Sequence, residues 1–471
     1  MNLQEINNKV NEYLIEHETE FLEDLSGLIA IESVRDTETQ DAPYGKECAR
    51  ALEYMISLSQ KYGFETHNFE NHAATCIYRG KNDTVLLDVL SHLDVVAAGE
   101  GWSTNPFTLH RNGEYIYGRG VADDKGPSLT SLYALRALKE LGIVPENSIR
   151  LIFGSAEETG FDDLKYYFKT QKSAPNTFSP DACFPIYNGE KGRYAPDFSI
   201  ETDNKSAQRK VISFECGNAP NIVPERARCV ISGVGIDEIQ KNAKELESTL
   251  CVKFDLEEKA DGIHILCSGR SAHAALPKTG INSLTALIRL IVTLKLDECE
   301  SLSVFKNLDA LFPHNDTNGT AIGINMAEEI SGEITVTFSM LHFDGSKMLC
   351  VCDMRLPFCA TEENVKDVFV EKLTCAGFKV SGEMIKPHYV DKDGDFVKAL
   401  GKCYELVTQN KAETLVMGGS TYVHDIEGGV AFGAVTDFTD LNEHGANERV
   451  KLSDLMIAAR VFAISYIETT K

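Results

Sequence analysis

The amino-acid sequence predicts an α/β fold in which a domain with a mainly parallel, mixed sheet is interrupted by an inserted α+β domain. Two observations predict it. Apolar, strand-like runs alternate with helical patterns over the first 190 residues, and the same alternation resumes near residue 386. Between these parts the pattern changes to alternating strands with few helices, which is typical of a mainly antiparallel sheet.

The length agrees with a division into domains. At about 100–200 residues per domain, 471 residues correspond to two or three domains. We therefore expect residues 1–192 and 386–471 to form one domain and residues 193–385 to form the inserted one.

The first part of the chain is expected to begin with a long helix. Apolar residues recur at three- and four-residue steps from about Leu3 to Ile31, and a second helix is expected from Lys46 to Tyr62. Strands are expected at 74–79, 84–90 and 148–154, with a helix at 127–141 before the last strand. A strand, a helix and a strand in this order predict parallel pairing through a right-handed crossover.

The inserted segment contains five alternating runs, which are VISFE, ARCVISGVG, IHILCSG, EITVTFSML and KMLCVCDMRLP. Helices are expected at 236–250 and 282–296. In the last part of the chain we expect a helix at 395–409 and a short strand at 429–433.

Charge and composition exclude several classes of function. The chain has 46 Lys+Arg against 71 Asp+Glu, a formal net charge of −25. Because nucleic acids and anionic membranes bind basic surfaces, neither is expected as a partner. No run approaches the roughly 18 apolar residues of a membrane span, and the N-terminus lacks signal-peptide features. The thirteen cysteines contain no CxxC pair, which predicts reduced thiols and a cytoplasmic protein.

Acidic and imidazole side chains follow the expected strands of the first domain. They are found in Ser91-His92-Leu93-Asp94, Asp123-Asp124, Glu157-Glu158 and Asp181. In an open α/β sheet the carboxyl ends of neighbouring strands meet at one crevice. Carboxylates brought together there repel unless a cation neutralises them, so we expect a site for two divalent metal ions. One imidazole with several carboxylates suits Zn, Mn or Co.

Each piece of this pattern also has an ordinary structural interpretation. The His-x-Asp pair could lie on the surface, and the acidic pair at 157–158 could form an exposed turn. Asp123 and Asp124 could cap the helix that begins near Pro127, and we expect at least one of them to do so. Only the combination of all the pieces favours a metal centre.

The motifs HLD, GRGVADDKGP, AEET, PDACFP and NEHGANE resemble, in order and spacing, a family of cocatalytic metallopeptidases and amidohydrolases. This family includes acetylornithine deacetylase, succinyl-diaminopimelate desuccinylase, aminoacylase and carboxypeptidase G. The length, the GEKG sequence and the long insertion are most similar to the PepV-type, carnosinase-like dipeptidases that cleave Xaa-His dipeptides. The resemblance covers nearly the whole chain and implies a metallopeptidase domain with an inserted α+β lid.

The resemblance also implies the ligands of two divalent ions per chain, Zn or Mn, with Co as a further candidate. Asp123 would bridge both ions. His92 and Asp181 would complete one site, and Glu158 and His444 would complete the other.

Two further residues near the metals gain roles from the same resemblance. Glu157 would be the general base that takes a proton from a bridging water and later gives it to the leaving amine. Asp94 would hold His92 in the tautomer that binds metal.

The resemblance places substrate-binding residues in the lid and near the C-terminus. His273 would stabilise the tetrahedral oxyanion, Arg355 would contact the substrate carboxylate or the intermediate, and Asn221 would lie near the C-terminal end of the substrate. The Gly-Gly-x-T-Y stretch is present at 418–422, and its Gly419 is assigned to substrate binding.

Three departures from the family pattern lie on the substrate side. Gly445 follows His444 where relatives have Gln, and Val423-His424 stand where an Arg often follows the Tyr. The sequence at 435–439 replaces a usual F-P-G element. We expect these changes to affect substrate preference rather than hydrolysis.

The resulting functional hypothesis is a cytoplasmic dimetal dipeptidase that acts on small peptides. The insertion of about 190 residues favours a monomer, because deacylase relatives generally carry a shorter insertion used for dimerisation. One alternative keeps the metals but makes the protein an N-acyl-amino-acid deacylase or desuccinylase. Another is a metal-binding homologue that no longer hydrolyses anything.

Overall fold

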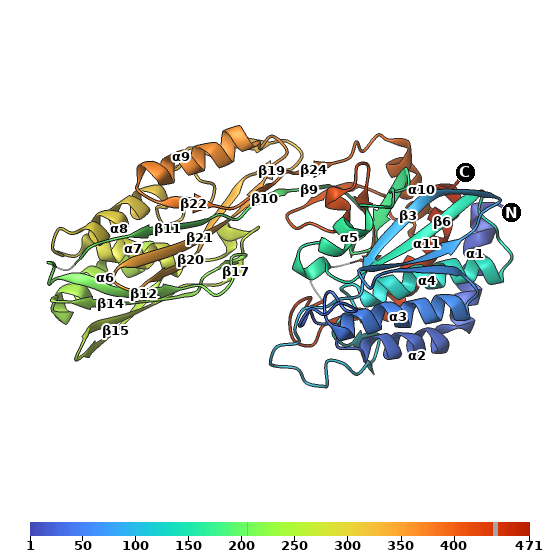
Figure 1. The fold of residues 1–471 in the computed structure, drawn as a ribbon, viewed down its shortest axis with the longest axis horizontal. Coiled ribbons are helices and arrows are strands. Elements are labelled where there is room, and N and C mark those ends of the chain that lie inside the picture. Colours follow the sequence, from blue (N-terminus) through green and yellow to red (C-terminus); the bar gives the residue numbers. More distant parts are fainter. Residues whose placement is uncertain (205, 437–440) are drawn as a thin grey trace. The chain divides into compact units, whose positions relative to one another are not determined.

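The computed structural model describes residues 1–204, 206–436 and 441–471, and the chain divides into two compact units (Figure 1). The first unit contains residues 1–190 and 389–471, and the second contains residues 191–388. The first unit is therefore discontinuous in the sequence, and both of its segments contribute strands to one sheet.

The first unit is built on a nine-stranded mixed sheet. Its order is β1 (Glu65–Phe69), β2 (Ala73–Tyr78), β6 (Asn147–Gly154), β3 (Asn82–His92), β7 (Asn176–Ser179), β26 (Val430–Ala431), β9 (Ile186–Glu190) and β24 (His388–Tyr389), with β25 (Thr414–Met417) beside β9. β3 pairs in parallel with both β6 and β7, and β7 pairs in parallel with β26. The α/β fold class is confirmed, as is the parallel unit of β3, helix α4 (Lys125–Glu140) and β6.

The N-terminal helix predicted over residues 3–31 is two helices, α1 (Leu3–Glu16) and α2 (Glu18–Ile29). The break lies at His17, whose backbone leaves the helical region at φ −107° and ψ 12°. Its ring Nδ1 donates a hydrogen bond to the Tyr13 carbonyl (2.8 Å), and its ring stacks on the Tyr13 ring. The three- and four-residue apolar period continues across the break, which is why it did not reveal the break.

The remaining helices of the first unit are α3 (Lys46–Lys61), α5 (Asp162–Tyr167), α10 (Asp395–Thr408) and α11 (Leu452–Glu468). α11 packs against α4, α10 and α1, and most of its side chains are buried. The sequence pattern did not indicate α11, because a helix that is apolar on nearly every side gives no clear amphipathic period.

Helix α4 begins at Lys125, and Asp124 precedes it without making a side-chain capping hydrogen bond. The expectation that one of the paired aspartates caps this helix is therefore wrong for Asp124, which occupies the N-cap position. Its Oδ2 instead accepts hydrogen bonds from the backbone N–H of His92 (3.1 Å) and the hydroxyl of Ser128 (3.4 Å). The carboxylate thus fixes the end of strand β3.

The second unit contains a ten-stranded antiparallel sheet. Its order is β15 (Lys253–Lys259), β16 (Gly262–Ser268), β14 (Arg226–Ser232), β12 (Lys210–Cys216), β20 (Thr335–Phe343), β21 (Lys347–Leu356), β10 (Gly192–Tyr194) and β23 (Met384–Ile385), with β11 (Asp197–Glu201) beside β21 and β22 (Lys379–Ser381) beside β11. The five alternating runs of the sequence form β12, β14, β16, β20 and β21.

The helices of the second unit are α6 (Ile236–Leu250), α7 (Ser283–Thr293), α8 (Glu300–Leu311) and α9 (Asp367–Cys375). α6 has the predicted bounds, α7 ends earlier than expected, and α8 was not predicted. α7 packs on β14, β16 and β20 and helps to form a separate hydrophobic core.

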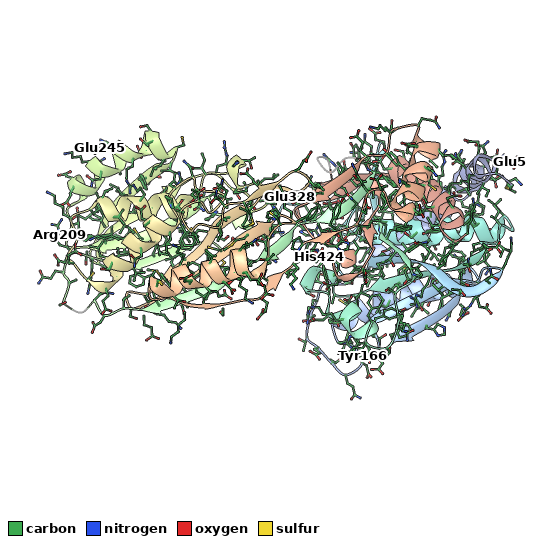
Figure 2. All side chains as sticks on the ribbon, turned by 90° about the horizontal axis from the view of Figure 1, so that it is seen from above. Glu5, Tyr166, Arg209, Glu245, Glu328 and His424 are labelled. Carbon is green, nitrogen blue, oxygen red and sulfur yellow. The ribbon has the colours of Figure 1, made fainter. Side chains whose placement is uncertain are left out.

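Many acidic residues lie on exposed helix surfaces, and Glu245 on α6 is an example (Figure 2). Among the residues that the structure describes, none of the helices combines the length and the apolar character needed to span a bilayer.

Candidate metal centre and lid residues

The residues predicted to bind metal meet at one edge of the first-unit sheet. His92 ends strand β3, Asp123 precedes helix α4, and Asp181 follows β7. Glu158 lies in a short 3₁₀ turn, η1 (Glu157–Thr159), after β6, and His444 comes from the distant C-terminal segment. The strand ends thus converge as the sequence analysis expects.

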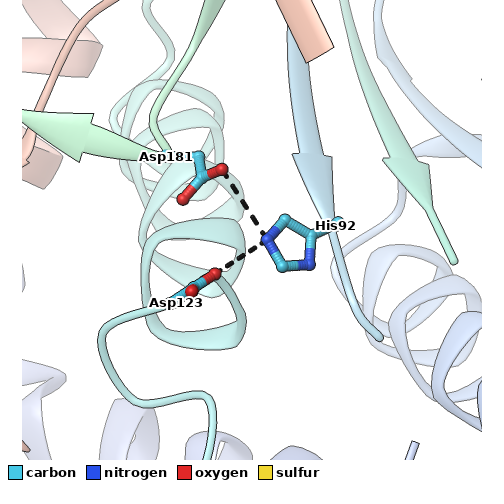
Figure 3. A group of neighbouring side chains, drawn as sticks. All are labelled: His92, Asp123 and Asp181. Carbon is cyan, nitrogen blue, oxygen red and sulfur yellow. Dashed lines mark ion pairs between the residues drawn. The ribbon is translucent and has the colours of Figure 1, made fainter. Parts of the chain in front are cut away.

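Asp123 is shared by two groups of ligand atoms. Its Oδ1 lies 2.9 Å from His92 Nε2, which is also 3.7 Å from Asp181 Oδ2 (Figure 3). Its Oδ2 lies 2.9 Å from His444 Nε2, which is 3.1 Å from Glu158 Oε1. Within each group the ligand atoms all lie within 4.8 Å of one another.

The tautomer of His92 is set by its backbone surroundings. Nδ1 donates to the carbonyl oxygen of Asp94 (2.9 Å), and a carbonyl oxygen can only accept, so the neutral ring carries its lone pair on Nε2. His92 Nε2 is buried and makes no hydrogen bond of acceptable geometry, although Asp123 is close. A buried lone pair that faces carboxylates fits a divalent cation.

The carboxylate of Asp94 has a second task. Its two oxygens accept hydrogen bonds from the backbone N–H groups of Glu157 and Glu158, each at 3.1 Å. Oδ1 lies 3.5 Å from His92 Nδ1. The main-chain carbonyl of Asp94 therefore fixes the tautomer, while its side chain fixes the acidic turn.

Asp163 and Tyr422 also support this turn, and sequence analysis did not assign either of them to the site. Asp163 is fully buried and accepts hydrogen bonds from the backbone N–H groups of Ser155 (2.6 Å) and Ala156 (2.8 Å) and from the hydroxyl of Tyr422. The Tyr422 ring meets the His92 ring edge-on, with centroids 6.2 Å apart. In the sequence, only the position of Tyr422 in the GGSTY motif could have indicated that this residue belongs to the site.

The pKa values show that the buried carboxylates of the site repel one another. Burial and the nearby Asp123 raise the pKa of Asp181 to about 7. Burial, together with Asp181 and Glu158, raises the pKa of Glu157 well above its ordinary value. Burial and the same aspartates also raise the pKa of Glu443 to about 9, and this residue, directly before His444, was missed by sequence analysis. Such a cluster favours bound cations.

Metal affinity is expected to weaken as the pH falls from 8 to 6. Hydrogen bonds to Asp123 and Glu158 raise the pKa of His444 to about 11, so the ring is protonated at neutral pH before a cation binds. Since an imidazolium has no lone pair for a metal, binding must release this proton, and roughly one or more protons should be released per chain at pH 7. Calorimetric titration with Mn²⁺ in buffers of different protonation enthalpy measures the number. Affinity independent of pH would contradict this prediction.

In the second unit, a two-stranded ribbon brings together two predicted lid residues. β13 (Ile222–Val223) pairs with β17 (Ala272–His273), and the N–H of Ala274 donates to the carbonyl of Asn221 (2.9 Å). The exposed His273 accepts a hydrogen bond at Nδ1 from the N–H of Ala275 (3.1 Å). The neutral ring therefore carries its proton on Nε2, where it can donate.

Arg355 lies on β21 directly opposite Arg193 of β10. The fully buried carboxylate of Asp353 joins them, because it accepts from Arg355 Nε (2.7 Å) and from Arg193 Nε (2.8 Å). Thr335 also lies opposite Arg355, and its hydroxyl donates to the carbonyl of Ala274, beside His273 (3.1 Å). The structure thus gathers the predicted lid residues at one end of this sheet.

Gly419 and two of the departures from the family pattern have different surroundings. His424 is buried, with Nδ1 2.8 Å from Glu190 Oε2, and the same carboxylate accepts from the N–H and the hydroxyl of Thr421 (Figure 2). A Cβ on Gly419 would meet no atom within 4 Å, so this residue faces open space. Of the segment 435–439, residues 437–439 lie outside the described residues.

Comparisons with known proteins identify the family to which the sequence is similar. The sequence profile of peptidase family M20/M25/M40 matches residues 89–466. The Beta-Ala-Xaa dipeptidase of Lactobacillus delbrueckii subsp. lactis is 34% identical over 463 residues, which cover 96% of each chain.

Solved structures share the fold at low sequence identity. Human carnosine dipeptidase 1 has a TM-score of 0.61 and 16% identity, covering 98% of this chain and 99% of that chain. The aminoacylhistidine dipeptidase of Vibrio alginolyticus has a TM-score of 0.56 and 14% identity, covering 94% and 96%. The extent of the profile match and of the Lactobacillus alignment shows that this chain belongs to peptidase family M20/M25/M40.

Proposed function

We propose that the protein is a dimetal dipeptidase that hydrolyses the single peptide bond of short substrates. One observation carries this proposal. The two oxygens of Asp123 face two separate ligand groups, one with His92 and Asp181 and one with Glu158 and His444. Glu157 lies beside both groups and belongs to neither. This is the division of labour that metal-assisted hydrolysis requires.

The ligand set suits Zn²⁺ or Mn²⁺, with Co²⁺ as a further candidate, because it combines imidazole with carboxylate. Two such ions, when bound, would act as Lewis acids on the scissile carbonyl and would lower the pKa of a bound water molecule. Asp123 would hold both ions at a fixed separation, and Asp94 would keep His92 in the tautomer that binds metal.

Glu157 would move the proton during the reaction. Its carboxylate, once ionised beside bound cations, would accept a proton from water and then donate it to the leaving amine. The hydrogen bond from its backbone N–H to Asp94 holds it beside the metal ligands without making it one of them.

We assign the recognition of the substrate to lid residues of the inserted domain, proposed as residues 193–385, with residues 1–192 and 386–471 forming the catalytic domain. His273 would donate from Nε2 to the developing oxyanion, as its tautomer allows. Arg355, oriented by Asp353, would bind the substrate carboxylate, and Asn221 would lie near the same end. Gly419 would leave room for the substrate backbone.

His273→Ala is expected to lower kcat by about 10²–10³-fold with little change in metal content, because one oxyanion donor is worth that much. His264 offers a matched control, since it lies in the same unit and its ring pairs with Asp261. Steady-state kinetics on one dipeptide compares the two variants. An unchanged kcat for His273→Ala would remove this residue from the mechanism.

A substrate panel tests the whole proposal. Protein loaded with Mn²⁺ or Zn²⁺ should cleave dipeptides, including β-alanyl dipeptides such as those named for the Lactobacillus relative, and should leave tripeptides and N-acyl amino acids largely intact. Preferential turnover of N-acyl amino acids would instead identify a deacylase. Absence of turnover with two ions bound would make the protein a binding homologue.

We further propose that the enzyme acts as a monomer in the cytoplasm. The long insertion and the cysteines without a CxxC pair support this assignment. Light scattering after gel filtration tests the oligomeric state, and a mass of twice the chain mass would refute the monomer.

A further inference from the structure

The loop that leads to Asp123 and the segment that carries His444 are joined through one buried carboxylate. Glu448 Oε1 accepts hydrogen bonds from the backbone N–H groups of Gly120 (3.0 Å), Ala122 (2.9 Å) and Asp123 (3.3 Å). Its other oxygen also accepts from Gly120 (3.0 Å). The side chain of Glu448 is 1% exposed, so these bonds are shielded from water.

Arg119 completes the connection from the loop side. Its Nη1 donates to Glu448 Oε2 (2.7 Å), and its Nη2 donates to the carbonyl of Gly445 (3.1 Å), next to His444. The guanidinium stacks over the ring of Trp102, with 5.2 Å between Cζ and the ring centroid. One arginine therefore bonds to both ends of the segment 445–448.

The segment around His444 needs such external support. His444 has a left-handed backbone (φ 58°), and so do Asn442 (φ 53°) and Asn447 (φ 59°). Non-glycine residues in this region store strain and persist only where the surroundings hold them. The side chain of His444 is also 54% exposed, so packing does little to fix it.

The ligands of the other group are held differently. The side chain of His92 is 1% exposed, and its backbone and ring are fixed by Asp124 and Asp94. Within the described part of the chain, the side chains of Arg119 and Glu448 form hydrogen bonds with neither His92 nor Asp181. The buried ion pair thus supports the group with His444 through both of its chain segments, and reaches the group with His92 only through the shared Asp123.

We propose that Arg119 and Glu448 are positioning residues that set the affinity of the metal site formed by Asp123, Glu158 and His444. They fix the distance between the backbone of Asp123 and the backbone beside His444. The proposal rests on the ligand set of the proposed function. Because the pair touches no metal, its effect is expected in binding before any effect on chemistry.

The test is a calorimetric titration of metal-free protein with Mn²⁺. Wild-type protein should bind two ions. Glu448→Gln should weaken the binding of one ion by about 10–100-fold and the binding of the other much less, since the second group shares only Asp123 with the first. Glutamine keeps the shape, but its NH₂ group cannot accept from the backbone donors. Arg119→Lys keeps the positive charge, but lysine cannot donate to Glu448 and Gly445 with the planar geometry of a guanidinium. We therefore expect a loss of metal affinity smaller than that of Glu448→Gln.

Two controls separate positioning from general stability. Asp88→Asn breaks another buried ion pair of the first unit, in which Arg150 Nε and Nη2 donate to the carboxylate at 2.8 and 2.7 Å. It should lower the unfolding temperature without changing either metal affinity. On a His444→Ala background, adding Glu448→Gln should weaken the binding of the remaining ion only slightly, because the pair then acts through Asp123 alone.

The outcomes are distinct. Equal weakening of both ions in Glu448→Gln, no weakening at all, or the same selective loss in Asp88→Asn would overturn the positioning role while the proposed function stands. A wild-type protein that binds fewer than two ions would overturn the ligand set and this inference together.

Discussion

Glu157→Ala is expected to lower kcat for a dipeptide by on the order of 10⁴-fold while both metal ions stay bound. The ions should stay bound because the carboxylate of Glu157 belongs to neither ligand group. The rate should fall because this carboxylate is the proposed proton carrier; burial and neighbouring acids raise its pKa well above the ordinary value. Stopped assays at high enzyme concentration measure the residual rate, and elemental analysis after gel filtration measures the metal content.

The adjacent residue offers a matched control for this prediction. Glu158→Ala removes a carboxylate from the same turn, and Glu158 Oε1 lies 3.1 Å from His444 Nε2 in a ligand group. This variant should lose one ion. If Glu157→Ala also lost an ion, Glu157 would be a ligand, and another residue would have to move the proton.

Asp123→Asn is expected to abolish both activity and the binding of both ions. Each oxygen of Asp123 lies 2.9 Å from the imidazole of a different group, so one substitution damages two sites. An amide also keeps only one oxygen, and its NH₂ group cannot bind a cation. Elemental analysis and calorimetric titration with Mn²⁺ measure the loss.

Asp181→Asn makes the same chemical change in a carboxylate that belongs to a single group. It should cost one ion and leave the second near its wild-type affinity. Retention of both ions by Asp123→Asn, or equal losses in the two variants, would contradict a bridging role for Asp123.

Much of the fold could be predicted because the residue patterns are local. The buried run of β3 and the alternating runs of the second-unit sheet gave the correct strands. The break at His17 and the existence of α11 could not be predicted in this way, because the apolar period continues through the first and is nearly absent from the second.

The residues of the candidate site also differ in whether a local sequence pattern indicates them. The candidate metal ligands follow strand ends or stand in recognisable motifs, so the sequence could single them out, and the structure brings them together in two groups. Asp163, Arg119 and Glu448 act on backbone groups or on residues far away in the sequence. Such hydrogen bonds depend on folded geometry and leave no periodic or spacing signal in the chain.

The order of strands in the first-unit sheet also governs when this protein can become active during its synthesis. β26 lies between β7 and β9, although Val430 is made long after Glu190. At about 5–20 residues per second, the ribosome needs on the order of tens of seconds to make the intervening chain. Throughout that interval the sheet is incomplete and His444 has not been added. Because His444 is assigned to the metal centre, we expect a nascent chain to cleave no peptides until the segment that carries this residue has been made and has folded.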